Sequence, residues 1–273
     1  MADLPNVDDL ARTIPDGALL ALPPDHSLGS VALVHALIRR GARDLRLLGV
    51  PVGGFLFDLL IGAGAVAEIE TSAVSLGEAG TAPRFTAALA AGGLRLRDAT
   101  CPAIHTALQA AEKGVPFLPL RGLLGSDILA HRPDWKVIDN PFATRPDPIV
   151  LIPAIQPDFA LFHAPFADQA GNVWVGRRRD LATMAHAARE ALVSVERVIA
   201  GDMLEDERLA PGVISGVYIG AIALAPNGAA PLGLLDEYPA DAGHIAAYAR
   251  AARSTAGFAD YLARFVQRAP ALT

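Results

Sequence analysis

Residues 45–80 constrain the fold of this chain more than any other stretch. An apolar run at 45–50 leads into a pair of glycines, a short helical stretch and a β-branched run at 66–74. A buried strand that passes through glycines into a helix and then into a second strand is typical of a β-α-β unit. The stretch ends in a glycine-containing loop that carries Glu78. Because loops at strand ends often carry functional side chains, Glu78 is the first candidate for chemistry.

The same alternation of strands and helices precedes and follows this stretch. A strand is predicted at 18–22, and a helix at 27–40, where apolar residues recur at helical spacing. Further elements are predicted in the order helix 83–91, strand 94–97, helix 102–113, strands 117–120, 149–154, 159–164 and 173–176, helix 181–189, and strands 191–199 and 213–224. Since parallel strands need crossover helices, the pattern predicts an α/β fold with an open, mostly parallel sheet flanked by helices.

Two segments depart from this alternation. Residues 121–148 mix glycine, proline and charged residues without a clear period, and we predict an irregular excursion there. Residues 240–273 are rich in alanine and are predicted to form a helical C-terminal tail.

The composition restricts the classes of partner. Hydrophobic residues make up 52% of the chain, yet no apolar run reaches the roughly 18–20 residues of a membrane-spanning helix. A net charge of -6 argues against nucleic acid as a partner, because that role needs a basic surface. The chain contains one cysteine, and its first ten residues are acidic rather than basic and apolar. We therefore expect a cytoplasmic protein with no membrane partner.

The glycine turn and the Glu78 loop are the strongest candidate sites. Backbone N–H groups at paired glycines between a strand and a helix can stabilise an oxyanion, although a plain tight turn has the same sequence pattern. Glu78 taken alone would usually be a surface acid. Adjacent parallel strands bring their carboxyl ends to one edge, which favours a shared site. The candidates are Gly53, Gly54, Phe55, Ser75 and Gly77 for oxyanion or substrate binding, and Glu78 for catalysis.

Other motifs are weaker. Residues 62–67 match a G-x-G-x-x-A dinucleotide fingerprint, but a helix is predicted before them and a strand after them, the reverse of the order that the fingerprint needs. His163, in an apolar strand, is interpreted as a hydrogen-bonded core residue. His105 and His131 lack partners at metal-ligand spacing, so no metal site is predicted. Arg177–Arg179 is interpreted as a solvated loop rather than as a phosphate site.

Six segments carry a further, longer pattern: Ile14–Gly17, Leu45–Gly49, Asp58–Gly64, Ala107–Pro119, Pro157–His163 and Ala167–Asn172. In this order they resemble the α-type subunit of the family I coenzyme A transferases, in the glutaconate CoA-transferase branch. The two last segments look like that family's "PD-(apolar)-H … AD-x-x-GN" signature. The correspondence runs nearly end to end, which implies a single domain over residues 1–273 with the CoA-transferase-like fold.

The resemblance implies a CoA thioester as substrate, no permanently bound cofactor, and a β-type partner in a heterodimer or heterotetramer. In such enzymes a glutamate attacks the thioester, and that glutamate belongs to the β-type chain, while the α-type chain would supply donors from turns such as Gly53-Gly54. Some members of the branch are instead hydrolases that open a ring of a cyclic diketone CoA thioester with a glutamate on the α-type chain, which would be Glu78 here. The position of the catalytic glutamate, on this chain or on the partner, stays open.

Three further alternatives belong to other classes. Related folds serve as sugar-phosphate isomerases and as sensor domains of transcription regulators. A regulator needs a basic helix-turn-helix, and residues 1–30 show none. The chain could also be a non-catalytic scaffold whose partner holds all site residues.

Overall fold

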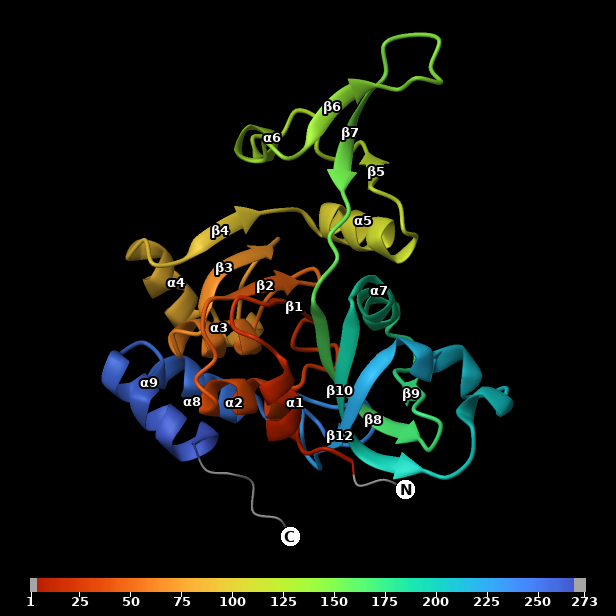
Figure 1. Ribbon diagram of the computed structural model, residues 1–273. Coiled ribbons are helices and arrows are strands. Elements are labelled where there is room, and N and C mark those ends of the chain that lie inside the picture. The colour runs from red at the N-terminus through yellow and green to blue at the C-terminus, as the bar shows by residue number, and fades with distance from the viewer. Residues whose placement is uncertain (1–3, 268–273) are drawn as a thin grey trace.

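A computed structural model describes residues 4–267 of the chain. Within this part, nine strands belong to one open sheet (Figure 1). Its parallel strands follow the order β12 (Ile219–Leu224), β10 (Glu190–Ile199), β8 (Phe159–Asp168), β1 (Leu19–Leu22), β2 (Leu45–Gly49), β3 (Val66–Thr71) and β4 (Arg95–Asp98). Two short strands, β9 (Val173–Trp174) and β11 (Val213–Ile214), extend β8 in antiparallel pairing. The predicted open, mostly parallel sheet is confirmed.

Helices cover both faces of the sheet (Figure 1). One apolar cluster receives α1 (Val7–Thr13), α2 (Val31–Arg39), α3 (Phe55–Gly62), α4 (Pro83–Ala90), α8 (Ala242–Ala251) and α9 (Thr255–Tyr261). The other cluster receives α5 (Cys101–Glu112) and α7 (Arg179–Ala187). Strand β1 shows why two clusters form, because Leu20 and Leu22 face the first and Ala21 faces the second. Such strands are apolar along their whole length, as the sequence indicated.

Helix α2 begins later than its periodicity predicts. The expected range was 27–40, but the helix starts at Val31, where the Ser30 hydroxyl accepts the Leu33 N–H at 3.3 Å and caps the first turn. Leu28 has a φ of 62°, which no α-helix contains. The residues between β1 and α2 therefore form a loop, and this loop contributes to the site described below.

The run at 213–224 is not one strand as predicted. A 3₁₀ turn at Gly216–Tyr218 separates β11 from β12. The Gly216 N–H donates to the Asn172 side chain at 2.9 Å, which draws the chain away from the β11 direction. Strand β3 also ends at Thr71, before the predicted 74, although an isolated bridge continues between Gly53 and Val74.

The segment predicted as irregular, 121–148, contains regular structure. It includes α6 (Ile128–His131) and β6 (Lys136–Asp139), and β6 pairs with β7 (Pro148–Pro153). Together with β5 (Phe117–Leu120), these strands form a separate antiparallel sheet in the order β5-β7-β6 that projects from the body (Figure 1). These strands are only four to six residues long, and exposed proline and charge conceal their alternation.

The remaining expectations concern the tail, the core histidine and the glycines after α3. The tail is helical through α8, α9 and a π-helical turn at Leu262–Val266, and residues 268–273 lie outside the described part. His163 is fully buried, with its ring nitrogens 2.7 Å from the Ser194 hydroxyl and 2.8 Å from the Glu196 carboxylate, as predicted.

Gly62 ends α3, so the dinucleotide interpretation of residues 62–67 is excluded. Within residues 4–267 no helix is long and apolar enough to cross a bilayer.

Candidate active site

A pocket of about 650 Å³ lies where the parallel strands end. Asp25 and His26 reach it from the loop after β1, and Leu76, Glu78 and Ala79 reach it from the loop after β3. Strand β1 pairs with β2 on one side and β8 on the other, so successive connections leave it in opposite directions. Ligands bind at such a switch point in open α/β sheets. The topology therefore marks this pocket as the candidate active site.

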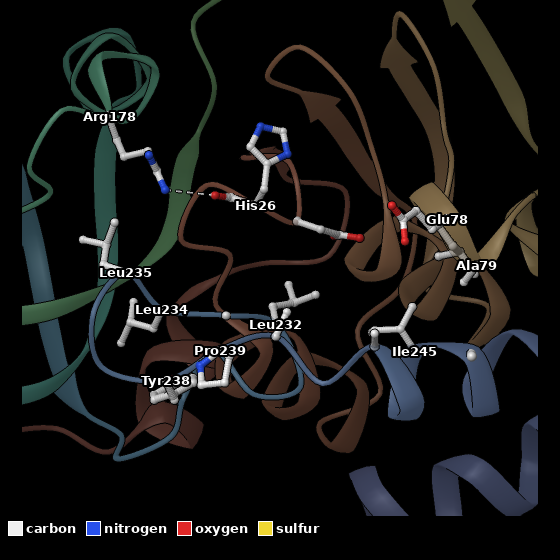
Figure 2. A pocket seen from close by; sticks show the side chains of 16 residues that line it. His26, Glu78, Ala79, Arg178, Leu232, Leu234, Leu235, Tyr238, Pro239 and Ile245 are labelled. Carbon is white, nitrogen blue, oxygen red and sulfur yellow. Dashed lines mark hydrogen bonds between the residues drawn. The ribbon is translucent and has the colours of Figure 1, made fainter.

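Glu78 lies on the rim of the pocket, as Figure 2 shows. It is exposed and sits in a 3₁₀ turn, Gly77–Ala79, that Gly77 opens with a φ of 61°. The Ser75 hydroxyl accepts the Gly77 N–H at 3.1 Å, and Leu76 is buried beneath the turn. Ser75 and Gly77 thus shape the loop that presents Glu78, and they do not line the pocket themselves.

Asp25 is a second carboxyl group in the pocket, and sequence reasoning missed it. Its two oxygens accept the Phe55 N–H at 2.8 and 3.0 Å, at the first turn of α3. Burial raises the pKa of Asp25 to about 6, partly opposed by N–H donors at Phe55 and Leu56. The signal in the sequence is an acid in the short connection between the first strand, which ends at Leu22, and the helical spacing that starts at 27.

The glycine turn, Gly53-Gly54, leaves room for the Asp25 carboxylate to reach the start of α3. A Cβ at Gly54 would overlap the Asp25 carboxylate, so only glycine admits this contact. The Gly53 N–H donates to the Ala73 carbonyl at 2.8 Å, and the Phe55 N–H is taken by Asp25. The Gly53 and Phe55 N–H groups therefore already have partners within the chain. The oxyanion or substrate-binding role of Gly53, Gly54 and Phe55 stays a prediction.

The rest of the lining divides into a polar and an apolar side. Arg178 donates from Nη2 to the His26 carbonyl at 3.2 Å, which links the start of α7 to the loop after β1 (Figure 2). Tyr238 also lines the pocket, and its hydroxyl donates to Glu196 at 2.8 Å. Apolar side chains lie opposite the polar groups in Figure 2: Leu232, Leu234, Leu235, Pro239 and Ile245.

The arrangement combines an exposed carboxylate, a second carboxyl group that titrates near pH 6, a cation and an apolar wall. A carboxylate can act as a nucleophile toward an activated acyl group or as a base toward water. The apolar wall can hold the hydrocarbon part of such an acyl group. Within residues 4–267 no group of three or more His, Cys, Asp or Glu side chains lies close enough to hold a metal ion.

Comparison with known proteins identifies the family. Residues 6–217 match the family described as coenzyme A transferase. The chain belongs to the coenzyme A transferase family. The predicted resemblance and the prediction of an enzyme are both confirmed by this match.

Relatives within the family are subunits of different enzymes. The A-type subunit of glutaconate CoA-transferase from Acidaminococcus fermentans is 31% identical over 245 residues, 83% of this chain and 75% of the relative. The cholesterol ring-cleaving hydrolase IpdA subunit of Rhodococcus jostii is 30% identical over 244 residues, 86% of this chain and 82% of the relative. The crystal structure of the Acidaminococcus glutaconate coenzyme A-transferase superimposes with a TM-score of 0.89 at 25% identity, covering 98% of this chain and 90% of that one. This chain is accordingly the α-type subunit of a coenzyme A transferase family enzyme.

Proposed function

We propose that this chain pairs with a β-type partner chain and that the pair transfers coenzyme A between an acyl-CoA thioester and a carboxylate. The observation that carries the proposal is Glu78 on the rim of a pocket with an apolar wall, in a chain of this family. The acyl group lies against Leu232 and Ile245, and its carbonyl carbon lies near the Glu78 carboxylate. CoA enters as a substrate, so the reaction uses no permanently bound cofactor.

The transfer proceeds through two covalent steps. A glutamate carboxylate attacks the thioester carbonyl, the C–S bond breaks, and an acyl-glutamyl anhydride and CoA thiolate result. The thiolate then attacks the glutamyl carbonyl, which releases the first acid and leaves a glutamyl-CoA thioester. The second carboxylate takes CoA from this thioester by the same two steps in reverse. We assign direct contact with the reacting acyl group to Glu78, and the nucleophile is either Glu78 or a glutamate of the β-type partner.

A second candidate is ring opening of a cyclic diketone CoA thioester by water, the class of reaction named for the IpdA relative. Asp25 favours it, because a carboxyl group with a pKa of about 6 in the same pocket as Glu78 can donate a proton while Glu78 acts as a base. Water attacks a ring carbonyl, the adjacent C–C bond breaks, and the carbanion formed takes up a proton. The product is a single ring-opened molecule that carries the new carboxylate and still carries CoA.

The proposal also covers the partner chain and the cellular compartment. The relatives named above as subunits support a partner chain in a heterodimer or heterotetramer. The single cysteine supports a reducing cytoplasm as the site of action.

The test uses this chain co-purified with the β-type chain of the same genome. CoA exchange between acyl-CoA and free carboxylates indicates the transferase, and turnover with water alone indicates the hydrolase. Glu78→Gln keeps the shape and removes the charge, so we expect kcat to fall by about 10²-fold or more. Glu205→Gln, at another exposed glutamate outside the pocket, is the control with kcat unchanged.

Mass spectrometry of the trapped intermediate locates the nucleophile. A CoA adduct on the peptide containing Glu78 assigns the covalent step to this chain, and an adduct on the partner assigns Glu78 to a supporting contact. Near-normal turnover of the Glu78→Gln complex with every substrate would overturn the role of Glu78.

A further inference from the structure

A second pocket, of about 690 Å³, lies beside the candidate active site. It is enclosed by β9, the start of α7 and the segment that leads into β11. Four arginines line it, Arg177, Arg178, Arg179 and Arg208, and we call it the arginine pocket. No acidic side chain of the described chain belongs to its lining. So many cations in one cavity are unusual in a chain whose net charge is -6.

The charges of these arginines are only partly compensated. Arg208 lies 3.6 Å from Asp206, whereas Arg177 and Arg179 form no ion pair within residues 4–267. The Nε atom of Arg178 is buried and has no hydrogen-bond partner in the described chain. A buried N–H donor without an acceptor is destabilising, and a ligand oxygen would satisfy it. Guanidinium groups match the geometry of phosphate oxygens.

Arg178 lines both pockets, so the two cavities are neighbours. In a CoA thioester the pantetheine arm separates the reacting acyl group from the diphosphate and the 3′-phosphate. A substrate with its acyl group beside Glu78 therefore needs a cationic site that is close to the acyl pocket but distinct from it. The arginine pocket meets this requirement, and Trp174 and Pro211 give it an apolar wall suited to a nucleobase.

We propose that the arginine pocket binds the phosphate groups of the CoA thioester, with Arg177, Arg178 and Arg179 as their ligands. The assignment of CoA as the source of these phosphates rests on the proposed function. Arg177 and Arg179 are exposed, as a solvated loop would be, and the proposal assigns a binding role to this run because Arg178 lines both cavities at the start of α7.

Binding to the full-length chain tests the pocket without any need for turnover. The probe is adenosine 3′,5′-bisphosphate, titrated by calorimetry into the wild-type chain and into the double variant Arg177→Gln/Arg179→Gln. Loss of two charge-assisted contacts should weaken binding by about tenfold or more. The matched control, Arg253→Gln, removes an exposed arginine outside both pockets and should bind as the wild type does. Equal affinity in the double variant and the wild type would overturn the proposal.

Two further measurements identify the source of the phosphate. Coenzyme A should bind the wild-type chain more tightly than dephospho-coenzyme A, and inorganic phosphate should bind more weakly than either. Inorganic phosphate that binds as tightly as coenzyme A would overturn the assignment to CoA. In the complex with the β-type partner, the double variant should raise KM for the acyl-CoA by about tenfold and leave KM for the matching acyl-pantetheine thioester unchanged.

Failure of this inference differs from failure of the proposed function. If the complex turns over acyl-CoA and the double variant changes neither binding nor KM, the inference is wrong and the proposed function stands. If no acyl-CoA is turned over but the double variant weakens binding of coenzyme A, the phosphate site stands and the proposed reaction is wrong.

Discussion

Asp25 and Glu78 are carboxyl groups of one pocket in opposite surroundings. Asp25 is partly buried and receives a backbone N–H at the start of α3, whereas Glu78 lies exposed on a glycine-bounded turn. Burial dominates at Asp25 and raises its pKa to about 6, with the nearby Asp58 adding to the effect. The Asp25 carboxyl group can therefore keep its proton at mildly acidic pH, which is the basis for assigning it the role of proton donor.

This shift predicts how stability depends on pH. Because the pKa of Asp25 lies above its usual value of 3.8, the native state binds that proton more tightly than the unfolded state does. The contribution of protonated Asp25 to the free energy of unfolding is present below pH 4 and is lost as the pH rises to about 6. Asp25→Asn lacks this titration, so its stability relative to wild type should rise by about 1–3 kcal/mol between about pH 4 and pH 7. Urea unfolding at both pH values measures the difference, and a pH-independent difference would contradict the assignment.

At the scale of elements, the turn between β2 and α3 joins the sheet to the pocket. Gly53 pairs with the chain after β3 through the Ala73 carbonyl and the Ser75 N–H, and Gly54 leaves room for Asp25. The two glycines hold two loops of the site together, and their predicted contact with a substrate stays a prediction. We expect them to affect the reaction through the position of Asp25 and of the turn that carries Glu78.

Gly54→Ala tests this role of the turn. The added Cβ overlaps the Asp25 carboxylate, so the loop after β1 must move, and we expect a loss of about 1–3 kcal/mol in stability together with reduced turnover. Gly93→Ala is the control, because its Cβ would meet only one atom, 3.9 Å away, and its φ is not positive. Denaturant unfolding of both variants gives the comparison. Equal unfolding midpoints for the two variants would show that the contact between Gly54 and Asp25 does not contribute to stability.

At the scale of the whole molecule, the pocket is open on the side where Glu78 and His26 are exposed. An acyl-glutamyl anhydride reacts with water, so a transferase must exclude water from this rim. The described chain provides no further element over it, and the proposed β-type partner is expected to cover it.

The chain alone should therefore transfer no CoA at a measurable rate. Titration of a fixed amount of this chain with the β-type partner should raise the rate until the two are equimolar, with light scattering reporting the assembly. An isolated chain that turns over acyl-CoA as fast as the mixture would contradict the need for a partner.

The sequence by itself determined the class of fold and the family, and it indicated Glu78 as the candidate catalytic residue. Apolar strands alternating with helical periodicity leave few arrangements other than a parallel sheet, because crossovers must run over its faces. Glu78 became a candidate because it lies in the loop that follows the second strand of the clearest β-α-β unit. These are local signals, carried by residues near one another in the chain.

The tertiary structure alone decided which residues that are distant in the sequence contact one another. Asp25 and Phe55 are thirty positions apart, and Arg178 meets the His26 carbonyl across 152 positions, so no local pattern records either contact. The start of α2 depends on a hydroxyl cap and on one residue with positive φ, which outweigh the helical spacing of 27–30. Burial of Asp25 likewise follows from the packing of the loop after β1 against α3, and burial is what sets its pKa.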